Sequence, residues 1–254
     1  MENGNNRMMN GIPDQTSKRT SSQQALDTMN ESPWQIRFRT IHHQVRDRIT
    51  LLFYPPGTRL DLDELAKEFE VSRTPIRTVL QRLEFEGLVT TRHGVGTTVN
   101  EIDFDSLHEV ASLRIHLAEL IGKLDPAPVQ SGAVEEFDRL IDRLGQLRKR
   151  PDLQEFSSID LANHKQISAL IGNSMLRRTY NELYYRNARM WFHFLPQLDW
   201  EMEMSAFTET IKLQRDAMAQ RDSVAVGFIT RNSISNVIYR LNHLLNTKRN
   251  DDNA

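Results

Sequence analysis

Two ionisable residues interrupt an apolar helical stripe in the second half of the chain. Six residues recur there at steps of three and four: Leu153, Phe156, Asp160, His164, Ile167 and Ile171. This spacing places them on one face of a helix. Because a buried charge costs free energy unless it is paired or liganded, Asp160 and His164 predict a polar cavity. A carboxylate and an imidazole one turn apart can share a divalent cation, although metal sites need three or four ligands. The alternative is a hydrogen bond between the two that orients a neutral histidine.

Polar residues also interrupt the apolar stripes of other helical segments. These residues are Arg114, Asn187, Ser233 and Asn236. Each taken alone is typical of a hydrogen bond between helices. Taken together with Asp160 and His164, they indicate a polar centre in this part of the chain.

A second chemical pattern lies near the N-terminus, where Arg73 and Arg77 are one helical turn apart. The apolar residues Ile76, Leu80 and Leu83 lie on the opposite side of the same segment. Arginine can bond guanine O6 and N7 in a bidentate manner in the DNA major groove, or it can bind a phosphate. The pair therefore indicates DNA recognition, and the alternative is a solvated arginine face.

Neighbouring residues extend this expected DNA surface. Ser72 and Thr74 can reach backbone phosphates from the start of the helix. Arg92, His93 and Gly94 lie in a glycine-containing turn that suits insertion into the minor groove.

The composition of the chain limits where DNA contacts can lie and which catalytic groups are present. The chain has 254 residues, 39% of them hydrophobic, with 32 Lys+Arg against 34 Asp+Glu and no cysteine. Any DNA contact must therefore come from a local patch, and disulfides, thiolate zinc sites and a cysteine nucleophile are excluded. No apolar run approaches the ~20 residues of a membrane span, and the start lacks the apolar core of a secretory signal. We expect a cytoplasmic protein without a membrane partner.

Local patterns predict the elements that position the arginines. A first helix begins near Trp34 and ends before Pro55, a second begins at Asp61, and a third begins at Ser72. Two short strands then flank the sequence HGVG as a hairpin. Three helices and a hairpin define a winged helix-turn-helix.

The second half of the chain contains only helical patterns. We expect six helices, at about 103–124, 131–149, 152–171, 174–195, 201–220 and 222–246. In the first of them the inward stripe is expected to be Val110, Leu113, Leu117, Leu120 and Leu124. The fold class is therefore mainly α, a winged helix-turn-helix followed by an antiparallel helical bundle. The expected division is 1–33 (disordered arm), 34–100 (DNA-binding domain), 101–246 (helical domain) and 247–254 (disordered tail).

The run PPGTRLDLDELAKEFEVSRTPIRTVLQRLEFEGLVTTRHGVGTTV resembles the DNA-binding domain of GntR-type bacterial transcription regulators. The resemblance implies a homodimer on a palindromic operator, with Arg73, Thr74 and Arg77 on the recognition helix and His93 and Gly94 in the wing. Asp63 stands where some members carry a DNA-contacting arginine, so that contact is expected to be absent.

The helical second domain resembles the FCD branch of this family, mainly in its helix layout and in Asp160-x3-His164. The resemblance implies a small effector, often a carboxylate and frequently beside a metal ion, with Arg114 binding the carboxylate. Metal-binding members supply two further histidines, but the matching places here are about Ile211 and Ser233. We therefore expect weak metal binding or none.

The resulting hypothesis is a regulator, expected to be a repressor, whose effector changes the placement of two DNA-binding domains. Activation is equally compatible with these residues. One alternative is a regulator whose helical domain only dimerises. The other is a metal-dependent hydrolase using Asp160 and His164, which the absence of a G-x-S-x-G elbow and of a phosphate loop disfavours.

Overall fold

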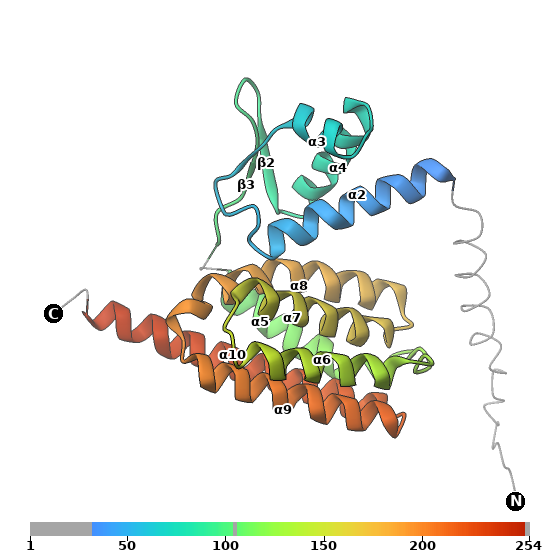
Figure 1. Cartoon of the computed structure of the whole chain (residues 1–254), viewed down its shortest axis with the longest axis vertical. Coiled ribbons are helices and arrows are strands. Elements are labelled where there is room, and N and C mark those ends of the chain that lie inside the picture. Colours follow the sequence, from blue (N-terminus) through green and yellow to red (C-terminus); the bar gives the residue numbers. More distant parts are fainter. Residues whose placement is uncertain (1–31, 104–105, 252–254) are drawn as a thin grey trace, which may run out of the picture. The chain divides into compact units, whose positions relative to one another are not determined.

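The computed structural model describes residues 32–103 and 106–251 (Figure 1). Most of the expected N-terminal arm, residues 1–31, and the last three residues of the expected tail lie outside this part. The chain divides into a short unit, Met1–Arg37, and a long unit, Phe38–Ala254.

The N-terminal part of the long unit is a winged helix. Its elements are α2 (Pro33–Thr50), β1 (Arg59–Leu60), α3 (Leu62–Glu68), α4 (Arg73–Phe85), β2 (Val89–Arg92) and β3 (Gly96–Val99). The three strands form an antiparallel sheet in the order β1-β3-β2. The β2–β3 hairpin is as expected, whereas β1 was not predicted because two residues carry no alternation to detect.

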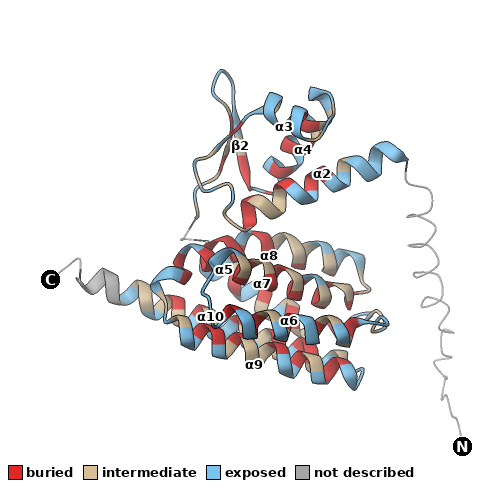
Figure 2. Ribbon diagram, viewed as in Figure 1, coloured by how far each residue is buried: buried red, intermediate tan, exposed pale blue. Residues whose placement is uncertain are grey.

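Local signals explain where the helices of the winged helix begin. The Asp61 carboxylate accepts hydrogen bonds from the amides of Asp63 and Glu64, at 2.7 and 3.1 Å, and so caps α3. Ser72 stands at the N-cap of α4 without a side-chain capping bond. The buried faces then meet in one core that contains Val45, Ile76 and their apolar neighbours (Figure 2).

The second part of the long unit is helical throughout the residues described. Its helices are α5 (Leu107–Glu119), α6 (Ala133–Leu147), α7 (Leu153–Ala169), α8 (Ser174–Phe194), α9 (Trp200–Ala219) and α10 (Ser223–Asp251), with a short 3-10 turn at Leu195–Gln197. They correspond to the six expected helices, and α10 ends at Asp251 rather than near residue 246. The expected fold class, a winged helix-turn-helix followed by a helical domain, is confirmed.

The inward face of α5 differs from the expected stripe. Leu113 and Leu124 are 46% and 42% exposed, while Ala118 is fully buried. Glycines explain the difference: a Cβ on Gly122 would lie 2.3 Å from the backbone of Ser223, at the start of α10. Backbones approach this closely only through small residues, so the small-residue side of α5 faces α10 and the larger leucines turn outward.

Aromatic residues fill the centre of the helical domain. The Phe156 ring is completely buried and lies 5.2 Å from Trp191 and 5.1 Å from Phe207, centroid to centroid. Such edge and tilted contacts add to the burial of apolar area. Among the described helices, none combines the length and apolar character needed to cross a membrane.

Candidate DNA-binding surface and ligand cavity

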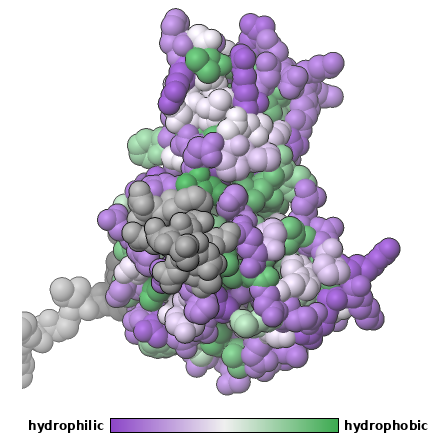
Figure 3. All heavy atoms as spheres, turned by 90° about the vertical axis from the view of Figure 1, so that its left-hand side faces the viewer, coloured by the Kyte–Doolittle hydropathy of each residue, from purple (hydrophilic) through white to green (hydrophobic). Residues whose placement is uncertain are grey.

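The residues expected to bind DNA lie at two places on the winged helix, and all are exposed. The first turns of α4 carry Ser72, Arg73, Thr74 and Arg77, and the β2–β3 connection carries Arg92, His93 and Gly94. Mostly hydrophilic side chains cover this part of the molecule, at the top of the space-filling view (Figure 3). The exposed Arg73, Arg77 and Arg92 supply positive charges on this surface, as contact with DNA phosphates requires.

The two arginines of α4 differ in their partners. Arg73 Nη2 donates to Asp63 Oδ2 at 2.8 Å, and both side chains are exposed. In the part of the chain that the structure describes, Arg77 has no ion pair. An exposed ion pair contributes only about 0–1 kcal/mol, so DNA can compete for Arg73. The sequence reasoning noted Asp63 as a missing DNA contact but did not foresee that it pairs with Arg73.

Gly94 sits at the tip of the wing with φ of 76°, in the left-handed region. A Cβ there would meet no atom within 4 Å. Glycine is therefore required by the backbone conformation and not by lack of space.

The helical domain contains a partly open cavity of about 330 Å³, lined by residues of α5, α7, α8, α9 and α10. All six residues expected to bind an effector line it: Arg114, Asp160, His164, Asn187, Ser233 and Asn236. The volume lies at the lower end of the range for small-molecule sites.

Asp160 and His164 do not bond to each other in this cavity. The Tyr184 hydroxyl donates to Asp160 Oδ2 at 2.8 Å, and His164 Nε2 bonds Asn181 Oδ1 at 2.9 Å. The His164 ring stacks on Tyr184 with centroids 3.5 Å apart. Each group therefore has its own partner, and the self-contained Asp–His hydrogen bond is not the arrangement found.

Burial controls the protonation of this pair. It raises the pKa of Asp160 to about 6, against the opposing effects of the Tyr184 hydroxyl and Arg114. Burial and then the nearby Arg114 charge lower the pKa of His164 well below its usual value. His164 is therefore neutral at pH 7, and Asp160 carries a carboxylate that the site disfavours.

Replacing Asp160 with asparagine should stabilise the ligand-free protein at high pH. The pKa of Asp160 is higher in the folded than in the unfolded chain, so the cost of its charge is absent below about pH 4, grows towards pH 6 and is complete above it. Asp160→Asn should exceed wild type by about 1–3 kcal/mol in unfolding free energy at pH 8 and match it at pH 4. Chemical denaturation at both pH values measures this. The exposed Asp142→Asn on α6 is the control, and a pH-independent difference for Asp160→Asn would contradict the assignment.

Arg114 is the central cation of the cavity and is only 7% exposed. Its Nη1 donates to Asn187 Oδ1 at 2.8 Å, and its guanidinium carbon lies 5.4 Å from the Tyr184 ring centroid. Within the described residues Arg114 has no ion pair, and its Nε has no hydrogen-bond partner. A buried cation without an ion pair favours binding of an anion.

Sequence reasoning missed two polar groups of the same cavity, both on α9. Glu203 is 1% exposed, and its Oε2 accepts from Arg240 Nη2 at 2.8 Å in a two-point ion pair. Gln214 is also 1% exposed and donates from Nε2 to Thr230 Oγ1 at 3.0 Å. Both are polar residues within the buried apolar stripe of α9 that contains Phe207. A polar residue within an apolar stripe is also the signal that identified Asn187 on α8.

The cavity residues do not assemble a multi-ligand metal centre. Among the described residues no group of three or more His, Cys, Asp or Glu side chains could hold a metal ion. Ile211 belongs to the apolar core, and Ser233 lies at the cavity wall beside Thr210. Weak metal binding or none therefore stays a prediction.

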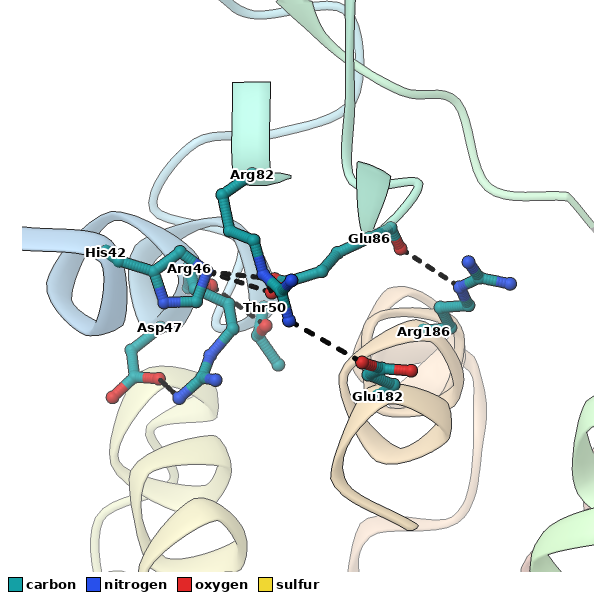
Figure 4. A network of polar contacts seen from close by, with 8 residues as sticks. All are labelled: His42, Arg46, Asp47, Thr50, Arg82, Glu86, Glu182 and Arg186. Carbon is teal, nitrogen blue, oxygen red and sulfur yellow. Dashed lines mark hydrogen bonds and ion pairs between the residues drawn. The ribbon is translucent and has the colours of Figure 1, made fainter. Parts of the chain in front are cut away.

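Helix α8 contacts the winged helix as well as the cavity (Figure 4). Arg186 Nε donates to the main-chain oxygen of Glu86, directly after α4, at 3.0 Å. The Glu86 carboxylate accepts from His42 Nε2 at 3.0 Å and from Arg82 Nε at 2.8 Å. Arg46 of α2 stacks over the Tyr185 ring at 3.6 Å. The C-terminal end of α4 and helix α2 are thus both tied to α8.

A short helix that presents exposed arginines beside a basic, glycine-tipped wing defines the winged helix-turn-helix class of DNA-binding domains. Residues 38–99 match the family model for "Bacterial regulatory proteins, gntR family". Residues 38–99 are thus similar to the domain that defines the GntR family of bacterial regulatory proteins.

Curated relatives agree with this assignment. A helix-turn-helix-type transcriptional regulator from an unstable DNA locus of Streptomyces ambofaciens is 35% identical over 137 residues, which cover 53% of this chain and 56% of the relative. The gluconate operon transcriptional repressor of Bacillus subtilis is 26% identical over 147 residues, 56% of this chain and 58% of the relative. The matches thus span little more than half the length of these relatives. The family and these relatives are transcription regulators, not enzymes.

Solved structures share the fold of a larger part of the chain. Escherichia coli McbR/YncC superposes with a TM-score of 0.65 at 18% identity, covering 84% of this chain and 98% of that one. A GntR regulator from Rhodococcus gives a TM-score of 0.59 at 19% identity, with 81% and 98% covered. At these identities the likeness concerns the fold alone.

Proposed function

We propose that this protein is a sequence-specific transcription regulator whose affinity for operator DNA is controlled by a small anionic effector bound in the helical domain. The observation that carries the proposal is Arg114, a buried guanidinium that has no ion pair with any described residue and that lines a cavity of about 330 Å³. A carboxylate fits it best, because a guanidinium can bind both carboxylate oxygens.

The proposal assigns residues 34–100 to DNA binding and residues 101–246, as an FCD-type domain, to effector binding and dimerisation. A homodimer in the cytoplasm would bind a palindromic operator, with recognition helices about one DNA turn, ~34 Å, apart. Two matched relatives are named as operon repressors, which favours repression over activation.

The six cavity residues have different roles in this proposal. Arg114 and Asn187 bind the carboxylate, while Ser233 and Asn236 on α10 bind other polar groups of the effector. Asp160 and His164 shape the polar wall and can hold water. A divalent metal is not needed, because Arg114 already supplies the positive charge.

Helix α8 is the element that couples the cavity to the winged helix. One of its faces lines the cavity with Tyr184 and Asn187, and another reaches the winged helix through Tyr185 and Arg186. An effector that binds one position of α8 better than another shifts the placement of the recognition helix. A ~100-fold preference supplies about 2.7 kcal/mol of coupling.

DNA selection followed by titration tests the proposal. A random DNA pool is selected with the full chain, and the affinity for the selected duplex is measured by fluorescence anisotropy with and without a panel of small carboxylic acids. We expect a palindromic preference and, for at least one acid, a change in Kd of about tenfold or more. Binding without sequence preference would refute DNA recognition. Specific binding that no acid alters would support a helical domain that only dimerises.

A further inference from the structure

We infer that the ligand of this cavity carries a hydrogen-bond donor, a hydroxyl or an ammonium group, in addition to its anionic group, and that Gln214 binds that donor. The inference rests on the proposed function and narrows its ligand class to hydroxy acids or amino acids. It follows from how neighbouring residues orient two buried amides.

The amide of Asn187 is oriented by Arg114. A guanidinium only donates hydrogen bonds, so the Asn187 atom that faces Arg114 Nη1 at 2.8 Å must be the oxygen. The Nδ2 group then has no partner among the described residues and is buried. Arg114 Nε has no partner either, so this end of the cavity offers two unused donors. Such an end binds an acceptor, and a carboxylate suits it best.

The amide of Gln214 is oriented in the opposite sense by Thr230. The Thr230 hydroxyl donates to the main-chain oxygen of Val226 at 2.8 Å, so it can only accept from Gln214. Gln214 therefore presents Nε2 to Thr230, at 3.0 Å, and its Oε1 is a buried acceptor without a partner in the described part of the chain. This end of the cavity binds a donor.

The other charged residues that α9 and α10 contribute to the cavity leave this polarity unchanged: Glu209 is exposed and is itself a hydrogen-bond acceptor, and Arg240 is paired. The Glu203 carboxylate, on the same helix, is already held by Arg240 at two points. Apolar side chains, including Phe207 and Ile229, also line the cavity. A fitting ligand therefore has an anionic group, an apolar part and a hydrogen-bond donor.

Two related classes of ligand are expected to bind more weakly because they offer Gln214 no hydrogen-bond donor. An unsubstituted acid leaves the buried Oε1 without a partner, and an unmet buried acceptor costs about 1–3 kcal/mol. A dicarboxylate brings a second acceptor against Oε1 and is disfavoured further. Sites built to bond a ligand hydroxyl discriminate strongly against analogues that lack it.

Calorimetric titration with four matched series of acids tests the inference. The probes are straight-chain acids of about four to eight carbons, unsubstituted or carrying a terminal hydroxyl, amino or second carboxyl group. For the chain length that fits, we expect the hydroxy or amino acid to bind at least about tenfold more tightly than the unsubstituted acid. Equal affinity of the two would overturn the inference and leave the proposed function standing. If no probe binds, the proposed anion site fails and the inference fails with it.

Gln214→Met provides the residue-specific arm, since methionine keeps the shape but removes the acceptor. This variant should bring the ratio of the two affinities close to one, because the hydroxy or amino acid loses its bond to Oε1 and the unsubstituted acid no longer leaves a buried acceptor unmet. Gln146→Met, an exposed change on α6, is the matched control and should leave the ratio unchanged. If Gln214→Met kept the wild-type ratio of affinities for the substituted and the unsubstituted acid, a group other than Gln214 would bind the donor.

Discussion

Replacing Arg77 with alanine is expected to weaken binding to the selected operator by about 10- to 100-fold while leaving non-specific DNA binding much less affected. Arg77 is exposed on the first turns of α4 and has no ion pair within the described residues, so its guanidinium is available to a base edge. A bidentate arginine–guanine contact contributes about 1–3 kcal/mol of discrimination. Anisotropy with selected and scrambled duplexes at one salt concentration measures both affinities.

The matched control removes the same charge from the helical domain. Arg177→Ala on α8 should leave the preference for the selected sequence intact, because Arg177 lies outside the winged helix. If Arg77→Ala lowered both affinities equally, Arg77 would contact phosphate and not a base. If neither affinity changed, α4 would not be the recognition helix.

Replacing Arg114 with methionine is expected to abolish measurable binding of carboxylic acids. Truncating one partner of a buried charge pair costs about 2–5 kcal/mol, which corresponds to ~30- to several-thousand-fold in Kd. The ligand-free variant should be close to wild type in stability, because removing a buried guanidinium that has no ion pair among the described residues offsets the lost hydrogen bond to Asn187 and the lost attraction to Asp160. Calorimetric titration and thermal unfolding give the two readouts.

Ligand affinity should be lost while thermal stability is kept, and this combination separates a binding role of Arg114 from a structural one. A variant that loses both ligand affinity and stability would indicate that Arg114 mainly supports the fold. Arg114→Lys keeps the charge without the planar fork, so it should retain part of the affinity. The operator affinity of ligand-free Arg114→Met should match wild type and no longer respond to acids.

Much of the fold follows from local sequence patterns. The Asp61 cap, the apolar period of α4 and the glycine-containing wing are short-range features, and the structure shows all three. The six cavity residues were identifiable because polar side chains interrupted stripes of period 3.6. Glu203 and Gln214 also interrupt an apolar stripe, so the same pattern could have identified them.

The α5 stripe shows where such reasoning fails. Periodicity ranked Leu113 and Leu124 as inward because they are apolar, but Gly122 and the backbone of Ser223 decide the packing face. Close backbone approach is a property of two helices far apart in the chain, so the pattern of one helix does not contain it.

The sequence by itself determined which helices form, which of their faces carry polar residues and which arginines project from the recognition helix, because these follow from neighbours within a turn or two. The tertiary structure alone decided the hydrogen-bond partners: Asp160 with Tyr184, His164 with Asn181, and Arg114 with Asn187, 73 residues away. Burial of Asp160 between the helices raises its pKa, and hydrogen-bond partners set the orientation of the cavity amides. Protonation and amide orientation depend on distances between helices, and only packing establishes such distances.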